Sequence, residues 1–342
     1  MKIHLKQHSD ESFAWKTAVA PFQKPHLPHS SWQIANSVGS YVLLWFAMYL
    51  SVSLSVWLTL GLAVLAAGFQ VRIFILFHDC AHGSFFASKR ANDVLGFITG
   101  VLTFTPYLHW RWEHCRHHAT SGNLNKRGMG DIKTMTVQEY LEATRFKRTG
   151  YRMLRNPVIL LLIVPVLLFL IKQRFPSAEA GKRERRSVHW TNLGILLMVA
   201  GLCWVFGIQM YVLIQLAITV VSGGAGIWLF YVQHQFEGVS WERDEKWDYT
   251  TAALDGSSFY RLPKLLQWFS GNIGFHHIHH LSPRIPNYNL EACHRASPCF
   301  HQVHQLTLWS SLRSLNLRLW DEKERRLVSF RHLRTLQSPR PG

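Results

Sequence analysis

The sequence has few charged residues and few cysteines. Only 17% of its 342 residues are charged, and none of its five cysteines forms a CxxC pair. No disulfide framework is therefore indicated, and we expect the working parts of the protein to face a reducing cytoplasm. The first 30 residues also lack the apolar core of a signal peptide, so insertion is expected to depend on the first transmembrane helix.

Apolar residues are abundant instead. The chain is 48% hydrophobic, contains 14 Trp and 21 Phe, and has long apolar runs that predict an integral membrane protein. It carries 37 Lys and Arg against 20 Asp and Glu, a formal charge of +17. Such an excess also occurs in nucleic-acid-binding proteins, but here the basic residues flank apolar segments, as they do beside an anionic leaflet. We therefore expect the chain to contact a lipid bilayer and no nucleic acid.

The long apolar runs predict an all-α fold: a four-helix, two-hairpin membrane scaffold with interfacial or re-entrant helices and a cytoplasmic histidine-rich cap. The first hairpin is expected between Trp32 and Phe77, a run too long for one span of about 20 residues, with a serine-rich break at 50–55. The second hairpin is expected at Trp190–Phe206 and Met210–Val232. Small residues in its second helix are expected to allow close packing, namely Gly223, Gly224 and Gly226.

Histidines form three clusters between and after these hairpins. They are His78 and His82 in HDCAH, His114, His117 and His118 in HCRHH, and His276, His277, His279 and His280 in HHIHH. Residues three and four positions apart share a helix face, so each cluster can present its imidazoles together. Neutral imidazole is the commonest protein ligand for first-row metals, and the clusters therefore point to a shared metal site. Because so many ligands exceed one four-coordinate site, two metals are the simpler interpretation.

Four nearby residues receive different interpretations. His277 is the extra member of the third cluster and is expected not to bind metal, and His109 is expected to be structural. Asp79 interrupts the histidine spacing, so it is expected to hydrogen-bond a ligand histidine rather than the metal. His234 follows the last span and is expected to complete the coordination. Eight other histidines are expected on a titratable surface: His4, His8, His26, His29, His294, His301, His304 and His332.

Two shorter apolar runs and the chain ends complete the organisation. Residues 94–107 are expected to form a re-entrant or interfacial helix ended by Pro106, because His82 and His114 must lie on one side of the membrane. Residues 157–171 are flanked by basic residues, so they dip into the membrane and return, lie in the interface, or form a short full span. We expect a cytoplasmic arm at 1–31, the membrane domain at 32–310 and a basic amphipathic tail at 311–342, helical to about residue 335.

These motifs resemble the membrane fatty acid desaturase family, whose signature is one HxxxH box and two HxxHH boxes facing the cytoplasm. The resemblance runs from about Ser31 to Leu290 and includes the segments HDCAHGSF, TSGNLNKRG and NIGFHHIHHLSPRIPNYNL. Within the family the chain is similar to the bacterial and plant acyl-lipid type, which acts on acyl chains of membrane lipids. The resemblance implies a histidine-bound di-iron centre that uses O2 and two electrons to introduce a cis double bond.

The resemblance also implies site residues, a partner and a location. It assigns the catalytic metal ligands as His78, His82, His114, His117, His118, His276, His279 and His280. His234 matches a further ligand after the last span, whereas the Asn that takes part four residues earlier in the acyl-CoA branch is Phe230 here. No HPGG motif of a cytochrome b5 domain is present, so electrons are expected from a separate ferredoxin or cytochrome b5-type donor that docks on the basic surface. The expected location is a bacterial inner membrane, with the catalytic face cytoplasmic.

Other functions fit parts of the pattern. A hydroxylase or ketolase acting on a lipid or hydrocarbon shares the histidine boxes, but the lipid context of the third box favours desaturation. A metal transporter would hold its site at mid-membrane, whereas these histidines lie beyond the apolar runs. A scaffold that has lost catalysis would not be expected to have complete boxes.

Overall fold

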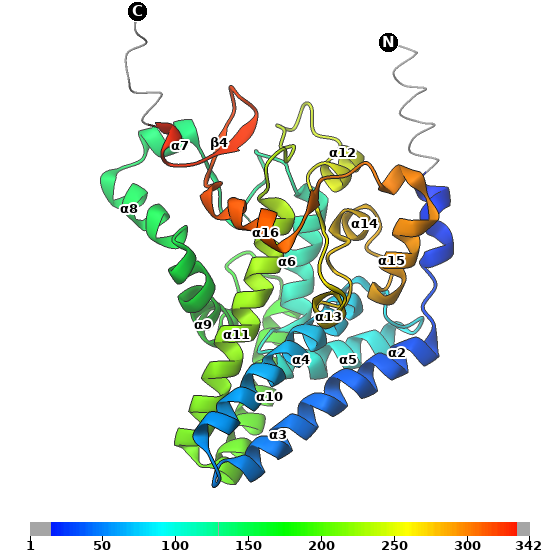
Figure 1. Cartoon of the computed structure of the whole chain (residues 1–342), viewed down its shortest axis with the longest axis vertical. Coiled ribbons are helices and arrows are strands. Elements are labelled where there is room, and N and C mark those ends of the chain that lie inside the picture. Colours follow the sequence, from blue (N-terminus) through cyan, green and yellow to red (C-terminus); the bar gives the residue numbers. More distant parts are fainter. Residues whose placement is uncertain (1–14, 129, 334–342) are drawn as a thin grey trace, which may run out of the picture.

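The computed structural model describes residues 15–128 and 130–333 and is mainly helical (Figure 1). Within these ranges four helical segments are long and apolar enough to cross a membrane: Leu27–Ser51, Val56–His82, Lys182–Phe206 and Ile208–His234. The predicted fold class, a membrane scaffold of four helices in two hairpins, is confirmed. The helices converge toward one end of the molecule, and both ends of the described chain lie at the other (Figure 1).

The first hairpin runs through α2 (Leu27–Ile34), the π-helical turn η2 (Ala35–Gly39), α3 (Ser40–Ser51) and α4 (Val56–His82). It begins inside the segment predicted as a polar arm, because Pro28 suits the first turn of a helix. The predicted serine-rich break is the turn between the two spans. There Ser55 caps α4, its side chain accepting a hydrogen bond from the backbone N–H of Leu58.

The second hairpin consists of α10 (Lys182–Phe206) and α11 (Ile208–His234). They meet at Gly207, whose φ of +76° is accessible to glycine but strained for other residues. α11 packs along α4, and α3 packs on the same helix. The buried core of the spans is made by Tyr41, Trp45, Met48, Ala63, Ala66, Ala67, Ile73, Tyr211, Ile214 and Ile218.

The two shorter apolar runs are helical but differ in shape. α5 (Lys89–Leu102) begins and ends before the predicted limits, and Pro106 caps the start of α6 (Tyr107–Thr120) rather than ending α5. The chain turns between them at Phe104, whose φ is +56°. The second run is built from η3 (Ile159–Ile163), α9 (Val164–Val166), η4 (Leu167–Ile171) and η5 (Lys172–Arg174). It meets α8 (Arg145–Leu154) at 67°, the geometry of a broken span or a re-entrant loop.

Two of the three predicted packing glycines hold this second run against α11. A Cβ at Gly223 would lie 2.7 Å from the Cβ of Pro165, and a Cβ at Gly224 would lie 2.6 Å from the backbone oxygen of Leu161. At Gly226 no heavy atom would lie within 4 Å of an added Cβ. Close packing therefore depends on Gly223 and Gly224, and the prediction was wrong for Gly226.

A cap of short elements covers one end of the spans. Its remaining elements are η1 (Ala20–Phe22), β1 (Met135–Thr136), α7 (Val137–Glu142), α12 (Tyr249–Leu254), β2 (Phe259–Tyr260), α13 (Lys264–Phe269), α14 (His276–Leu281), α15 (Asn287–Ala296), η6 (Pro298–Phe300), β3 (Gln305–Leu306), α16 (Leu308–Ser311), η7 (Leu312–Asn316), β4 (Leu319–Asp321) and β5 (Arg326–Val328). The buried Arg72 of α4 joins this cap to the spans. Its Nε donates to Ser37 Oγ at 3.0 Å, and its guanidinium lies 4.0 Å from the centre of the Trp268 ring.

The tail is not the single amphipathic helix predicted over residues 311–335. After α16 and η7 the chain forms a β-hairpin, β4 antiparallel to β5, and β4 also pairs in parallel with the distant β1. The side chain of Asp321 starts the turn by accepting hydrogen bonds from the backbone N–H groups of Lys323 and Glu324. Leucine spacing alone could not reveal this pairing. Residues 334–342 and 1–14, with His4 and His8, lie outside the described residues.

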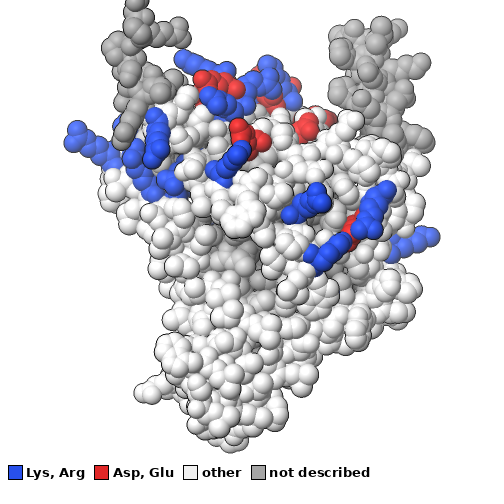
Figure 2. All heavy atoms as spheres, viewed as in Figure 1, with Lys and Arg blue, Asp and Glu red and all other residues white. Residues whose placement is uncertain are grey.

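The charged side chains are distributed unevenly. Figure 2 shows Lys, Arg, Asp and Glu gathered over the upper part of the view, around the cap, while the lower part formed by the spans has none on this face. Exposed apolar residues occupy the spans instead, among them Leu43, Phe46, Trp57, Leu197 and Trp204. This belt matches the hydrocarbon region of a bilayer, and the cap lies at one end of it.

Candidate metal centre

The last turn of α4 and the length of α6 bring the first two histidine clusters together. His78 and His82 are one turn apart at the end of α4, and Gly83 ends that helix in the left-handed conformation. On α6, His114 and His118 are also one turn apart and face them, with ring centres 4.9 Å apart for His78 and His114. α4 and α6 pack against each other, so the local helix spacing sets the geometry.

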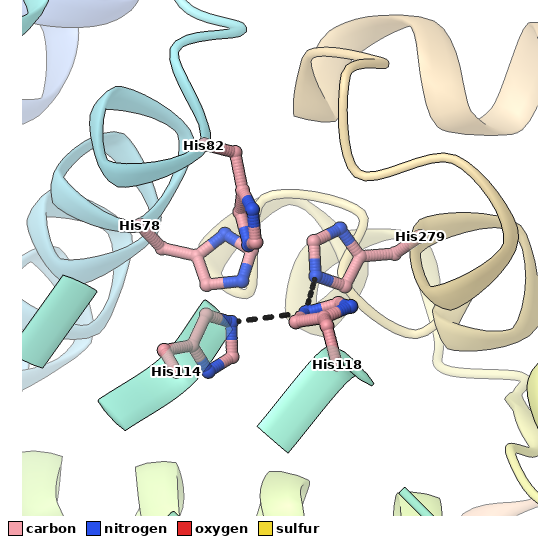
Figure 3. Close-up of side chains that lie close together, drawn as sticks. All are labelled: His78, His82, His114, His118 and His279. Atoms are coloured by element: carbon pink, nitrogen blue, oxygen red, sulfur yellow. Dashed lines mark hydrogen bonds between the residues drawn. The ribbon is translucent and has the colours of Figure 1, made fainter. Parts of the chain in front are cut away.

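A first group of five histidines forms where α14 meets these helices (Figure 3). Its ligand atoms all lie within 4.8 Å of one another, and its members are His78, His82, His114, His118 and His279. His118 is central: its Nε2 lies 3.1 Å from Nε2 of His114 and 3.0 Å from Nε2 of His279. Four of the five side chains are buried, and His82 is partly buried.

A second group of four histidines lies beside the first. It comprises His117, His234, His276 and His280, all buried, and its ligand atoms also lie within 4.8 Å of one another. His234, at the end of α11, is central: its Nε2 lies 3.2 Å from Nε2 of His117 and 2.9 Å from Nε2 of His276. The groups touch, because the rings of His118 and His280 stack with centres 4.2 Å apart.

The structure thus brings together all nine histidines that the sequence nominated and leaves two others out. His277 points away and lies 3.3 Å from His294, Nε2 to Nδ1, so it belongs to neither group. His109 accepts a hydrogen bond from the backbone N–H of Ser177. Two of the histidines expected at the surface are less exposed than predicted. His294 is half-buried beside His277, and Nε2 of His332 lies 3.2 Å from Oδ2 of Asp321.

The chemistry of this donor set fits two metal ions. Burial lowers the pKa well below the usual 6.5 for the imidazoles of His114, His118, His276, His279 and His280. Neutral rings carry a lone pair each, and nitrogen atoms that meet at about 3 Å need a shared proton or a shared cation between them. The buried Nε2 atoms of His82 and His280 have no hydrogen-bond partner among the described residues. Converging, unpartnered imidazole nitrogens are the ligands that suit Fe, Zn, Cu or Ni.

Oxygen atoms hold the outer nitrogens of three of these rings. Asp79 Oδ1 lies 3.3 Å from Nδ1 of His78, which is the partnership that the sequence suggested. A carboxylate oxygen of Asp131 contacts Nδ1 of His117, and the backbone oxygen of Gly256 lies 3.3 Å from Nδ1 of His234. Such contacts fix the ring orientation and direct the Nε2 lone pair inward. Asp131 was missed because it lies in a loop with no spacing that relates it to a histidine.

A cavity of about 450 Å³, including space open to solvent, lies beside the second group. Asp131, His234 and Phe230 are among the residues that line it. The Phe230 ring centre is 5.1 Å from that of His117 and 5.2 Å from that of His234. Position 230 therefore places an apolar ring beside the second group and offers no side-chain oxygen or nitrogen as a ligand.

Comparisons with known proteins identify the family. The family model described as fatty acid desaturase matches residues 55–311. The chain is 51% identical over 316 residues to a fatty acid desaturase of Bacillus subtilis, covering 92% of this chain and 90% of that protein. It is 27% identical over 265 residues to the sn-1 acyl-lipid omega-3 desaturase (ferredoxin) of a Nostoc species, covering 70% and 68%. It is 27% identical over 266 residues to the sn-1 oleoyl-lipid 12-desaturase of a Picosynechococcus species, covering 75% and 72%.

Proposed function

Because this chain belongs to the fatty acid desaturase family of membrane oxidoreductases, we propose that it introduces a cis double bond into acyl chains of membrane lipids. The proposal includes O2 as co-substrate and a pair of iron ions held by histidine. The single observation that carries it is the convergence of nine histidines into adjacent groups of five and four. The reaction removes two hydrogens from the acyl chain and, with O2, two electrons and two protons, yields the alkene and two molecules of water.

The ligand assignment follows the two groups. One iron would be held by His78, His82, His114, His118 and His279, and the other by His117, His234, His276 and His280. When bound, the irons would activate O2 for the cleavage of unactivated C–H bonds. The protein excludes water by burying the ligands, and Asp79, Asp131 and Gly256 orient three of the rings.

A lipid acyl chain is the proposed substrate because of the relatives and the position of the site. Two relatives are named as acting on acyl-lipid or oleoyl-lipid. His78 and His82 lie at the end of one apolar span, and His234 lies at the end of another. A saturated chain offers no polar handle, so selectivity must come from apolar surroundings that fix which carbons face the metals.

The electron donor is proposed to be a separate protein, a ferredoxin or a cytochrome b5-type protein. The name of the Nostoc relative includes ferredoxin. The formal charge of this chain is +17, and Lys and Arg side chains gather around the cap in Figure 2. A basic surface attracts an acidic donor and speeds its association at low salt.

We place the cap on the cytoplasmic side of a bacterial inner membrane. The basic residues of the cap support this orientation by the positive-inside rule. With α10 and α11 as two spans, His118 and His234 share one side only if the segment at 159–174 returns to the side from which it came. We therefore favour the re-entrant arrangement for the bent pair of α8 and the segment that follows it.

Product analysis tests the proposal. Membranes that contain the chain, supplied with saturated lipids, O2, reductant and a ferredoxin system, should gain cis-unsaturated acyl chains. Gas chromatography with mass spectrometry after derivatisation locates the new bond, and omission of O2 or of the donor should abolish it. Hydroxylated or keto products would replace the proposal by a hydroxylase or ketolase, a reading that the names of the relatives do not favour. Lipids unchanged under all conditions would contradict it.

A further inference from the structure

We infer that Gln33 and Asn287 are positioning residues for the first histidine group and that they act through Asp79. The inference rests on the proposed two-iron centre. Gln33 belongs to the first membrane span and Asn287 to the segment after the third histidine box. Neither residue touches a proposed metal ligand directly in any described contact. Both are linked to His78 by one continuous series of buried hydrogen bonds.

The Asp79 carboxylate is divided between two tasks. Its Oδ1 lies 3.3 Å from Nδ1 of His78. Its Oδ2 accepts two hydrogen bonds from Asn287, from the backbone N–H at 2.7 Å and from the side-chain Nδ2 at 2.8 Å. Asp79 is 2% exposed and has no ion pair with Lys or Arg in the described part of the chain. A buried carboxylate needs such donors, because water does not reach it.

The backbone donor comes from a helix start. Asn287 is the first residue of α15, which follows Pro286. The first N–H groups of a helix have no acceptor within that helix, and the helix dipole favours a negative charge there. The N-terminus of α15 therefore holds the Asp79 carboxylate against His78.

Gln33 decides which way the Asn287 side chain points. The two amides form a reciprocal pair: Gln33 Nε2 donates to Asn287 Oδ1 at 2.8 Å, and Asn287 Nδ2 donates to Gln33 Oε1 at 3.0 Å. With Oδ1 held by Gln33, Nδ2 keeps its second hydrogen for Asp79. A flipped Asn287 would set its Oδ1 against Asp79 Oδ2, and two acceptors cannot share a hydrogen bond. Both amides are buried, with Asn287 0% and Gln33 7% exposed, so water does not replace the missing partner.

The same region offers a matched control. The chain from Phe22 to Gln33 lies along residues 282–289 through several contacts. Tyr288 Oη accepts a hydrogen bond from the His26 backbone N–H at 2.8 Å and lies 3.2 Å from Ser30 Oγ. Tyr288 thus fastens the same two segments as Gln33 but has no bond to Asp79. Loss of its hydroxyl should loosen the contact between the segments and leave the carboxylate as it is.

The second group serves as an internal reference. Its rings are oriented by Asp131 and by the backbone oxygen of Gly256, and neither contacts Gln33 or Asn287 in the described hydrogen bonds. Loss of Gln33 should therefore weaken iron binding at one group only. A general loss of folding would affect both groups alike.

Iron release from the full-length holoenzyme tests the inference. The wild type, Gln33→Met, Asn287→Asp and Tyr288→Phe are loaded with 57Fe, and Mössbauer spectra and release to a ferrous chelator are recorded. We expect about tenfold faster release of one of the two irons in Gln33→Met and Asn287→Asp, with its spectrum altered, and no change in Tyr288→Phe. Release from Gln33→Met that matches Tyr288→Phe, or that is equally fast for both irons, overturns the inference.

A double-mutant cycle tests the route through Asp79. Asp79→Ala should itself speed release of the same iron, and adding Gln33→Met to it should bring no further change, because the acceptor on which Gln33 acts is gone. Full additivity of the two substitutions would overturn the inference. Wild-type protein that holds fewer than two irons contradicts the proposed function instead, so the two failures are distinguishable.

Discussion

Nε2 of His117 lies 3.2 Å from Nε2 of His234, although 117 positions separate these residues in the sequence. The neighbours of His117 in the same box, His114 and His118, belong to the other group. Residues 114 and 118 are one turn apart on α6, whereas residue 117 points to another face of the helix. One box therefore serves both groups, and α6 contributes side chains to each of them.

The ligand assignment predicts that His118→Ala and His279→Ala abolish product formation while the protein still inserts. His118 Nε2 contacts two other imidazoles of its group, so its loss removes a ligand and leaves a buried gap at the centre. We expect at least a 100-fold loss of unsaturated product, measured by gas chromatography, and less than one full equivalent of tightly held iron in the first group. His189→Ala, at an exposed position, is the control and should keep full activity. Activity retained in both ligand variants would remove the assignment.

Asp131 is predicted to support the second group as Asp79 supports the first. Asp131→Asn keeps the size of the side chain but removes the negative charge beside Nδ1 of His117. We expect a 10- to 100-fold weaker hold on one iron, about 1.4–2.7 kcal/mol, measured by competition with a chelator. Asp244→Asn is the matched control, because Asp244 contacts Asn123 and Lys126 near the same loop but no histidine of either group. Equal iron affinity in the two variants would refute the role.

The iron-free protein is predicted to lose stability as the pH falls below about 6.5. Burial lowers the pKa of the His118, His279 and His280 imidazoles well below 6.5, so the folded state does not take up their protons. In the unfolded chain these rings are protonated below their usual pKa, and protons therefore stabilise the unfolded state. The stability contribution is complete above pH 6.5 and declines at lower pH. The melting temperature should fall between pH 7.5 and 5.5, and more steeply in the wild type than in His118→Gln. An unchanged melting temperature would contradict the burial of neutral rings.

Packing of α11 on the bent segment is predicted to be sensitive to an added methyl group at Gly224 but not at Gly226. In Gly224→Ala the new methyl group would lie 2.6 Å from the backbone oxygen of Leu161, which cannot move as a side chain does. We expect a cost of about 1–3 kcal/mol, seen as a lower melting temperature in detergent. Gly226→Ala is the control, because no heavy atom lies within 4 Å of an added Cβ. Equal melting temperatures in the two variants would show that the close approach is not needed for stability.

The sequence could predict what local spacing controls. The HxxxH spacing of His78 and His82 and the helix positions of the second box give the inward faces directly, and apolar run lengths give the two hairpins. The sequence could not predict which histidines share a group. His117 of α6 contacts His234 at the end of α11 only because the chain folds these distant helices together. Asp131 and the partnership of Gln33 with Asn287 arise from loops and helix ends that meet only in three dimensions. The β4–β5 hairpin was missed for the same reason, since β4 is held by pairing with β1.

The two hairpins of the described chain turn at the narrow end of Figure 1 within residues 52–55 and at Gly207. Connections this short present almost no surface to the compartment beyond that end. A protease, an antibody or a regulatory protein on that side would have too few exposed residues in these two connections to bind. For the function proposed above, the electron donor would therefore dock on the capped side, and a regulatory protein would bind there or within the bilayer.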